Sequence, residues 1–127
     1  MSEKKKVLII TDGTNLIDSI AHSVKSAVTG TVKLCHAQAF DGTDLLASNI
    51  FFIGCENPNP SSFDYLEEML EHISFAGRHC GIFSTNKKTL KYLSDILKDC
   101  EAVIEEPLLI TEPDTATINN WIKGILE

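Results

Sequence analysis

Short apolar runs alternate with helix-like segments five times along this chain. Three of the runs are continuous, which is typical of strands buried on both faces of a sheet. They span residues 7–10, 50–53 and 80–83. The first is followed by Thr11 and the second by Gly54. We therefore expect these three runs to be the central strands.

Two further segments have the character of outer strands. Residues 31–37 alternate between apolar and polar side chains, which predicts a strand with one exposed face. Pro107 interrupts the apolar segment 102–110. Because proline has no N–H group to give to a central ladder, this segment is expected at an edge of the sheet.

Between the strands, apolar residues recur at helical spacing. They fall within residues 17–28, 66–73, 90–97 and 118–126, and residues 41–48 form a shorter helical connection. Ser61 or Ser62 is a candidate cap for the third helix, and Asp114 or Thr115 for the last.

This order of elements predicts a three-layer α/β fold with a doubly wound, five-stranded parallel sheet. Consecutive parallel strands need right-handed crossovers, so helices cover both faces. Strands one, three and four are the buried ones, which gives the order 2-1-3-4-5, as in flavodoxin-like folds. We expect residues 1–127 to form one domain.

Composition and charge argue against several classes of partner and location for this protein. The formal net charge is −7, which argues against binding to nucleic acid or to an anionic membrane. No apolar run approaches the roughly 20 residues that span a bilayer, and the run after the basic start is too short for a signal peptide. The four cysteines include no C-x-x-C pair, so no metal site is expected. These features together predict a cytoplasmic protein.

Candidate chemistry lies where ligands bind in open α/β sheets, beyond the carboxyl ends of the strands at the reversal of strand order. The loop after the first strand reads Thr11, Asp12, Gly13, Thr14 and Asn15. Hydroxyls, an amide, a glycine and a helix start are the parts of an anion cradle. The alternative is that Asp12 or Thr14 simply caps the helix. Because the Asp12 carboxylate would repel a phosphate, we expect it to point away from any ligand.

Two further loops meet at the same edge. The second contributes Cys55, Glu56 and Asn57, and the third contributes Ser84, Thr85 and Asn86. Cys55 is either a reactive thiol or a small buried side chain. The nearby Phe63 has the spacing of a core residue.

Catalytic constellations are not evident. The sequence holds no G-x-S-x-G elbow, no Walker A motif and no Gly-x-Gly-x-x-Gly. The four histidines are scattered without the spacing of metal ligands. We therefore assign no catalytic residues, and a non-catalytic protein is favoured over an enzyme.

The chain resembles the flavodoxin family over nearly its whole length. The resemblance is carried by residues 7–15, 44–54, 81–84, 97–103 and 106–108. It implies non-covalent binding of FMN and electron transfer to a redox protein with a basic surface. It also implies that the first loop holds the phosphate, while the backbone of 56–59 and 85–86 flanks the flavin ring.

The phosphate loop departs from the family pattern Ser/Thr-x-Thr-Gly-x-Thr. Gly13 stands where a threonine is expected, Thr14 where the glycine is expected, and Leu16 where the last threonine is expected. The second loop has no tryptophan or tyrosine to stack on a flavin. Two alternatives therefore stay open: a flavin-less binding or regulatory module with this fold, and an enzyme acting on a small phosphorylated ligand.

Overall fold

The computed structural model describes residues 6–28, 30–39 and 42–126. Its centre is a parallel sheet in the order β2-β1-β3-β4-β5, with β6 also pairing with β4. The strands are β1 (Lys6–Thr11), β2 (Thr31–His36), β3 (Ile50–Gly54), β4 (His79–Ser84), β5 (Val103–Ile104) and β6 (Leu108–Leu109). The predicted strand order and fold class are confirmed.

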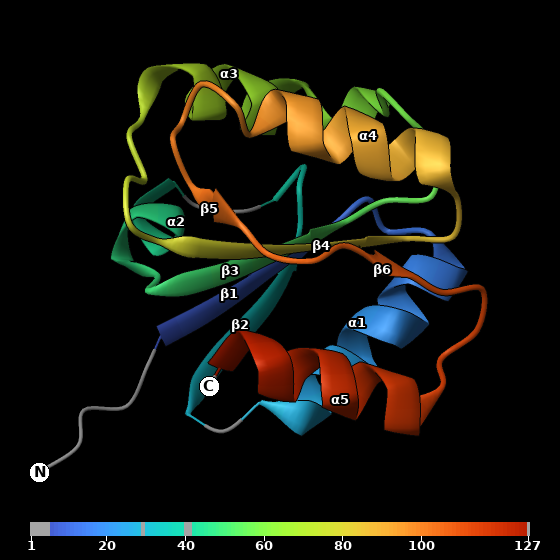
Figure 1. The fold of residues 1–127 in the computed structure, drawn as a ribbon. Coiled ribbons are helices and arrows are strands. Elements are labelled where there is room, and N and C mark those ends of the chain that lie inside the picture. The colour runs from blue at the N-terminus through green and yellow to red at the C-terminus, as the bar shows by residue number, and fades with distance from the viewer. Residues whose placement is uncertain (1–5, 29, 40–41, 127) are drawn as a thin grey trace, which may run out of the picture.

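Helices cover both faces of this sheet (Figure 1). On one face lie α1 (Asn15–Ala27) and α5 (Thr115–Leu126), and on the other lie α2 (Gly42–Ala47), α3 (Asp64–His72) and α4 (Lys87–Ile96). A short 3₁₀ turn, η1 (Ser61–Phe63), leads into α3. Residue 41 of the predicted helical connection lies outside the described residues. No helix in the described part of the chain is long and apolar enough to cross a membrane.

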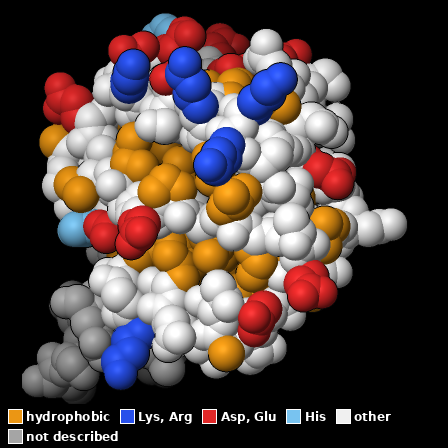
Figure 2. All heavy atoms as spheres, turned by 45° about the vertical axis from the view of Figure 1, so that its right-hand side comes forward, with side chains coloured by type: hydrophobic (Ala, Val, Ile, Leu, Met, Phe, Trp, Pro, Cys, Tyr) orange, Lys and Arg blue, Asp and Glu red, His pale blue; other side chains and the backbone are white. Residues whose placement is uncertain are grey.

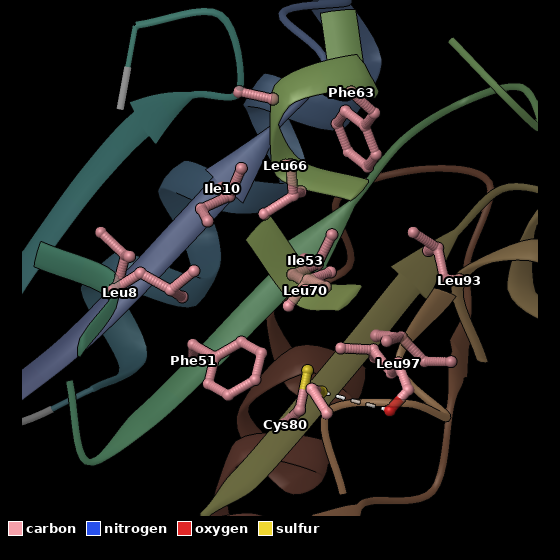
Figure 3. Packing of buried hydrophobic residues seen from close by; sticks show 14 of the residues in the cluster. Leu8, Ile10, Phe51, Ile53, Phe63, Leu66, Leu70, Cys80, Leu93 and Leu97 are labelled. Carbon is pink, nitrogen blue, oxygen red and sulfur yellow. Dashed lines mark hydrogen bonds between the residues drawn. The ribbon is translucent and has the colours of Figure 1, made fainter. Parts of the chain in front are cut away.

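The continuous apolar runs fill two cores because successive strand side chains point to opposite faces. In β1, Leu8 and Ile10 belong to the cluster that holds the buried residues of α2, α3 and α4, while Val7 and Ile9 belong to the cluster of α1 and α5. Figure 3 shows Phe51 on the α3 side, within the same cluster as Leu70. Burial of each such side chain contributes about 1.5–3 kcal/mol, so these runs fix which strands are central.

The predicted edge segment is divided into two very short strands. Val103 and Ile104 pair with the start of β4, and Leu108 and Leu109 pair with its end. Pro107 lies between them and cannot donate to the ladder. The edge location and the interruption at Pro107 are thus confirmed.

Helix starts differ in how well they were predicted. Asp114 begins α5 as expected, because its carboxylate accepts the Ala116 N–H at 3.1 Å and the Thr117 hydroxyl at 2.9 Å. Neither Ser61 nor Ser62 caps α3, because both lie within the 3₁₀ turn that precedes it. Sequence spacing alone did not reveal that extra turn.

Two strand glycines leave room for aromatic rings. A Cβ placed on Gly54 would lie 2.3 Å from the Phe83 ring, and one on Gly81 would lie 2.5 Å from the Phe52 ring. Trp121 of α5 packs edge-on against both rings, with centroid distances of 5.4 Å to Phe52 and 6.2 Å to Phe83. The small residues therefore permit an aromatic cluster between β3, β4 and α5.

We expect Gly54→Ala to lower the free energy of unfolding by about 1–3 kcal/mol, because the added methyl group overpacks the site against Phe83. Gly124→Ala is the matched control, since a Cβ there meets nothing within 4 Å and helix propensity favours alanine by about 1 kcal/mol. Urea unfolding measures both. Equal stability of the two variants would contradict the close packing described.

Candidate functional site

Three loops meet at the carboxyl edge of the sheet, where strand order reverses between β1 and β3. Thr11 at the end of β1 pairs with Gly54 at the end of β3, and Gly54 pairs with Phe83 of β4. The loops that follow these strands are therefore neighbours, on the right in Figure 1. This is the position at which open α/β sheets bind ligands.

The carboxylate of Asp12 closes the first loop. Its Oδ1 accepts hydrogen bonds from the Thr14 N–H at 3.1 Å and from the Thr14 hydroxyl at 2.8 Å. Its Oδ2 accepts the backbone N–H of Glu56 at 2.9 Å. Asp12 thus binds its own loop and ties that loop to the second one. Thr14 occupies the N-cap position of α1, but its side chain makes no capping hydrogen bond, so the capping expectation for Thr14 is wrong.

The backbone of one residue, Glu56, joins all three loops through its N–H and its carbonyl. Its N–H goes to Asp12, and its carbonyl accepts from Asn86 Nδ2 at 2.8 Å and from the Thr89 hydroxyl at 3.0 Å. Asn86 in turn caps α4 by accepting the Thr89 N–H at 2.9 Å. A second link lies beneath, where the Ser84 hydroxyl donates to the Cys55 carbonyl at 2.7 Å. The loop edge is therefore held together by hydrogen bonds within the chain.

A second carboxylate, that of Asp18 in α1, accepts a hydrogen bond from the Thr11 hydroxyl. Thr11 is fully buried, donates to Asp18 Oδ1 at 2.7 Å and accepts the Gly13 N–H at 3.3 Å. The other Asp18 oxygen lies 3.0 Å from His36 Nε2. Gly13 has φ +83, and a Cβ there would lie 3.6 Å from the His36 ring, so the imidazole lies against the loop.

Asp18 and His36 were missed by reasoning from the sequence. A signal for both was present in the predicted fold. Asp18 lies in the first turn of the helix that follows the loop. His36 ends β2 and pairs in register with Thr11.

The remaining candidates differ in exposure. Asn15 and Asn57 are exposed, Thr85 is half-buried, and Ser84 is fully buried.

Cys55 is fully buried. Burial, with Asp12 and Glu67 nearby, raises the pKa of its thiol. Because the thiolate is the nucleophile, the structure favours the buried alternative for Cys55. Phe63 is buried, as its spacing predicted.

The donor set of the first loop does not suit a phosphate. The Thr11 and Thr14 hydroxyls and the Gly13 and Thr14 N–H groups all donate to side-chain oxygens of this chain. The start of α1 carries a partial positive charge, but Asp12 already lies beside it. At 4 Å, a like charge opposes an anion by about 4 kcal/mol near a protein surface. The residues present therefore do not fit the phosphate end of FMN.

A flavin ring would likewise meet few aromatic side chains at these loops. Residues 55–62 and 84–89 contain no aromatic residue. Phe63, which follows the second loop, is buried beside Tyr92 of α4 with ring centroids 6.4 Å apart. It thus belongs to the core and not to the loop surface.

Comparison with solved structures identifies proteins that have the same fold. No protein-family model matches the chain, and no curated protein matches it. Among solved structures, flavodoxin 2 from Bacillus cereus matches with a TM-score of 0.81 at 20% identity, covering 95% of this chain and 97% of that one. A short-chain flavodoxin associated with a bacterial microcompartment matches with a TM-score of 0.77 at 15% identity, covering 95% of each chain.

A Fusobacterium nucleatum flavodoxin variant bound to flavin mononucleotide also matches, with a TM-score of 0.69 at 14% identity. The match covers 97% of this chain and 96% of that one. At such identities the likeness concerns the backbone. The chain therefore has the flavodoxin-like fold, as its sequence predicted.

Replacing Asp12 with alanine is expected to lower the free energy of unfolding by about 1–3 kcal/mol, the cost of leaving partly buried donors unsatisfied. Urea unfolding at pH 7 measures this. Glu112→Ala, at an exposed loop position, is the control and should stay within about 0.5 kcal/mol. If Asp12→Ala were as stable as the control, the Asp12 contacts would contribute nothing.

The thiol of Cys55 is expected to resist iodoacetamide in the native protein, because burial holds it protonated. Cys35 is half-exposed, and burial raises its pKa to about 11. Its alkylation rate should therefore rise about tenfold per pH unit between pH 7 and 10, as the thiolate fraction grows. Peptide mass spectrometry measures both sites. Labelling of Cys55 ahead of Cys35 would show that Cys55 is accessible.

Proposed function

We propose that this protein is a flavodoxin-fold binding module that works without FMN. One observation carries the proposal: the Asp12 carboxylate accepts the Thr14 N–H, the Thr14 hydroxyl and the Glu56 N–H. The site that would receive a phosphate is thus closed by an anionic group of the chain itself. In this proposal the hydrogen bonds at the loop edge stabilise the fold and do not bind a cofactor.

The energetic consequence for FMN follows from these contacts. A phosphate that used the same donors would first have to displace the carboxylate. Each hydrogen bond to a charged group contributes about 1.5–3 kcal/mol, and every 1.4 kcal/mol changes affinity tenfold. In the wild-type protein, FMN binding would have to supply the free energy that breaks the Asp12 contacts. This cost would weaken its affinity by several powers of ten.

A second candidate is an FMN-binding electron carrier, which the fold likeness and the partial positive charge at the start of α1 favour. In that case Thr11, Gly13, Thr14 and Asn15 would hold the phosphate. The backbone of 56–59 and 85–86 would flank the flavin ring. Its partner would be a redox protein with a basic surface, because the formal net charge of this chain is −7 and opposite charges favour association.

Titration with FMN separates the two candidates. We expect no saturable quenching of flavin fluorescence with up to about 100 μM protein, which corresponds to a binding free energy weaker than about −5.5 kcal/mol. Asp12→Asn removes the opposing charge and should raise affinity at least tenfold. Asp99→Asn removes an exposed charge beyond the C-terminal end of α4, at the opposite edge of the sheet, and should leave affinity unchanged. Submicromolar binding by the wild type, or a yellow purified protein, would favour the electron carrier.

A further inference from the structure

A shallow apolar groove runs along one flank of α3. Its lining consists of Tyr65, Glu68, Met69, His72 and Ile73, and its volume is about 270 Å³. Tyr65 is 51% exposed. The core-facing side of the same helix is formed by Leu66 and Leu70, both fully buried. The groove is therefore additional apolar surface, beyond what α3 needs for packing on the sheet.

The groove faces α2. A Cβ placed on Gly42 would lie 2.7 Å from Met69 Cε and 3.6 Å from the Tyr65 hydroxyl. One helical turn after Gly42, Leu46 is 47% exposed. Residues four apart lie on the same face of a helix, so Leu46 extends the apolar surface from α3 onto α2.

Unpaired carboxylates flank this groove. Asp64, Glu68 and Glu71 of α3 are exposed. Within the described part of the chain, none of them forms an ion pair. Side chains that combine an apolar strip with acidic margins match a partner with an apolar strip and basic margins.

The lysines of the neighbouring helix lie on the other flank of α3. Lys87, Lys88 and Lys91 of α4 are exposed, and Figure 2 shows basic side chains gathered along the upper part of the molecule. Glu67 is the α3 residue beside Tyr92 of α4, where burial and this carboxylate raise the tyrosine pKa. Tyr65 and Met69 point instead toward α2, so the α4 lysines do not line the groove.

Two other nitrogen-bearing side chains near the groove already have hydrogen-bond partners. Arg78 donates to the carbonyls of Leu46 and Ser48 at 2.6 and 3.2 Å. A ring nitrogen of His72, which lines the groove, lies 2.9 Å from the Glu68 carbonyl. Among the described residues, neither of these two side chains forms an ion pair with the acidic margin.

We propose that the groove between α3 and α2 docks a basic amphipathic helix of a partner protein. A helix docked in a groove is recognised through apolar residues three or four apart. The nine residues of α3 span about 13 Å, which is the length of two to three helical turns. Apolar side chains of the partner would contact Tyr65, Met69 and Leu46. Its lysines or arginines would pair with Asp64, Glu68 and Glu71.

This inference gives a partner class to the binding role proposed above and rests on that role. The groove lies on α3, whereas the flavin question concerns the loops after β1, β3 and β4. The FMN titration and the experiment below therefore report on different surfaces, and either can fail alone.

The test is an NMR titration of the full ¹⁵N-labelled chain with a synthetic 14-residue helix of leucine and lysine. A peptide of the same composition in scrambled order is the reference. We expect saturable shifts in residues 64–73 and 42–47, with the scrambled peptide at least tenfold weaker. Shifts that map elsewhere, or equal affinities for the two peptides, would overturn the proposal.

Matched variants separate the groove from general charge attraction. Glu68→Lys and Glu112→Lys change net charge equally, but only Glu68 lines the groove. We expect the first to weaken peptide binding at least tenfold and the second less than threefold. Equal weakening would mean that the acidic surface as a whole attracts the peptide, contrary to the proposal.

The apolar part of the groove has its own pair of variants. Tyr65 is 51% exposed and Leu109 of β6 is 46% exposed. Tyr65→Ala should weaken the peptide at least fivefold and Leu109→Ala less than twofold, with retained amide dispersion confirming that both fold. If the same α3 resonances shift on concentrating the protein alone, the occupant is a second copy and the proposal is wrong.

Discussion

The hydrogen bond from the Glu56 N–H to the Asp12 carboxylate is the contact on which the loop edge depends. A parallel sheet brings the ends of β1, β3 and β4 to one edge, but it does not fix the loops that follow. At this edge the backbone N–H of Glu56 is bound by Asp12, and its carbonyl by Asn86 and Thr89. Removing the Asp12 carboxylate would leave the N–H without its hydrogen bond, whereas the carbonyl has two donors.

The same contact carries the proposed function. A flavodoxin-like sheet places a helix start, hydroxyls and a glycine where an anion would bind. Here the Thr11 and Thr14 hydroxyls and the Gly13 and Thr14 N–H groups already have oxygen partners on Asp12, Asp18 and Thr11. The chain has the flavodoxin-like fold, but its function has to be argued from this edge, because function belongs to sites and not to folds. The apolar and acidic surface of α3 lies away from that edge.

The sequence was sufficient for the fold because its strongest signals are local. Continuous apolar runs identified β1, β3 and β4, and Pro107 marked the edge. The 3₁₀ turn before α3 was not predicted, because it depends on the path of a loop. Boundaries of this kind are weakly specified by spacing alone.

The site was harder to predict than the fold, since it depends on pairs distant in sequence. The sequence singled out Asp12 as an obstacle to a phosphate, but its partner, the Glu56 N–H, lies 44 residues away. His36 reaches Asp18 only after β1 and β2 pair in register. Such contacts follow from the register of the sheet and not from any motif.

Hydrogen exchange at the Glu56 amide tests the central claim most directly, because that amide is the donor to Asp12. After correction for intrinsic rates, the account predicts that the Glu56 amide exchanges at least about a hundred times more slowly than the exposed Asn57 amide. It also predicts that this protection is lost in Asp12→Ala. Exchange of Glu56 at the rate of Asn57 in the wild-type protein would contradict the closed loop.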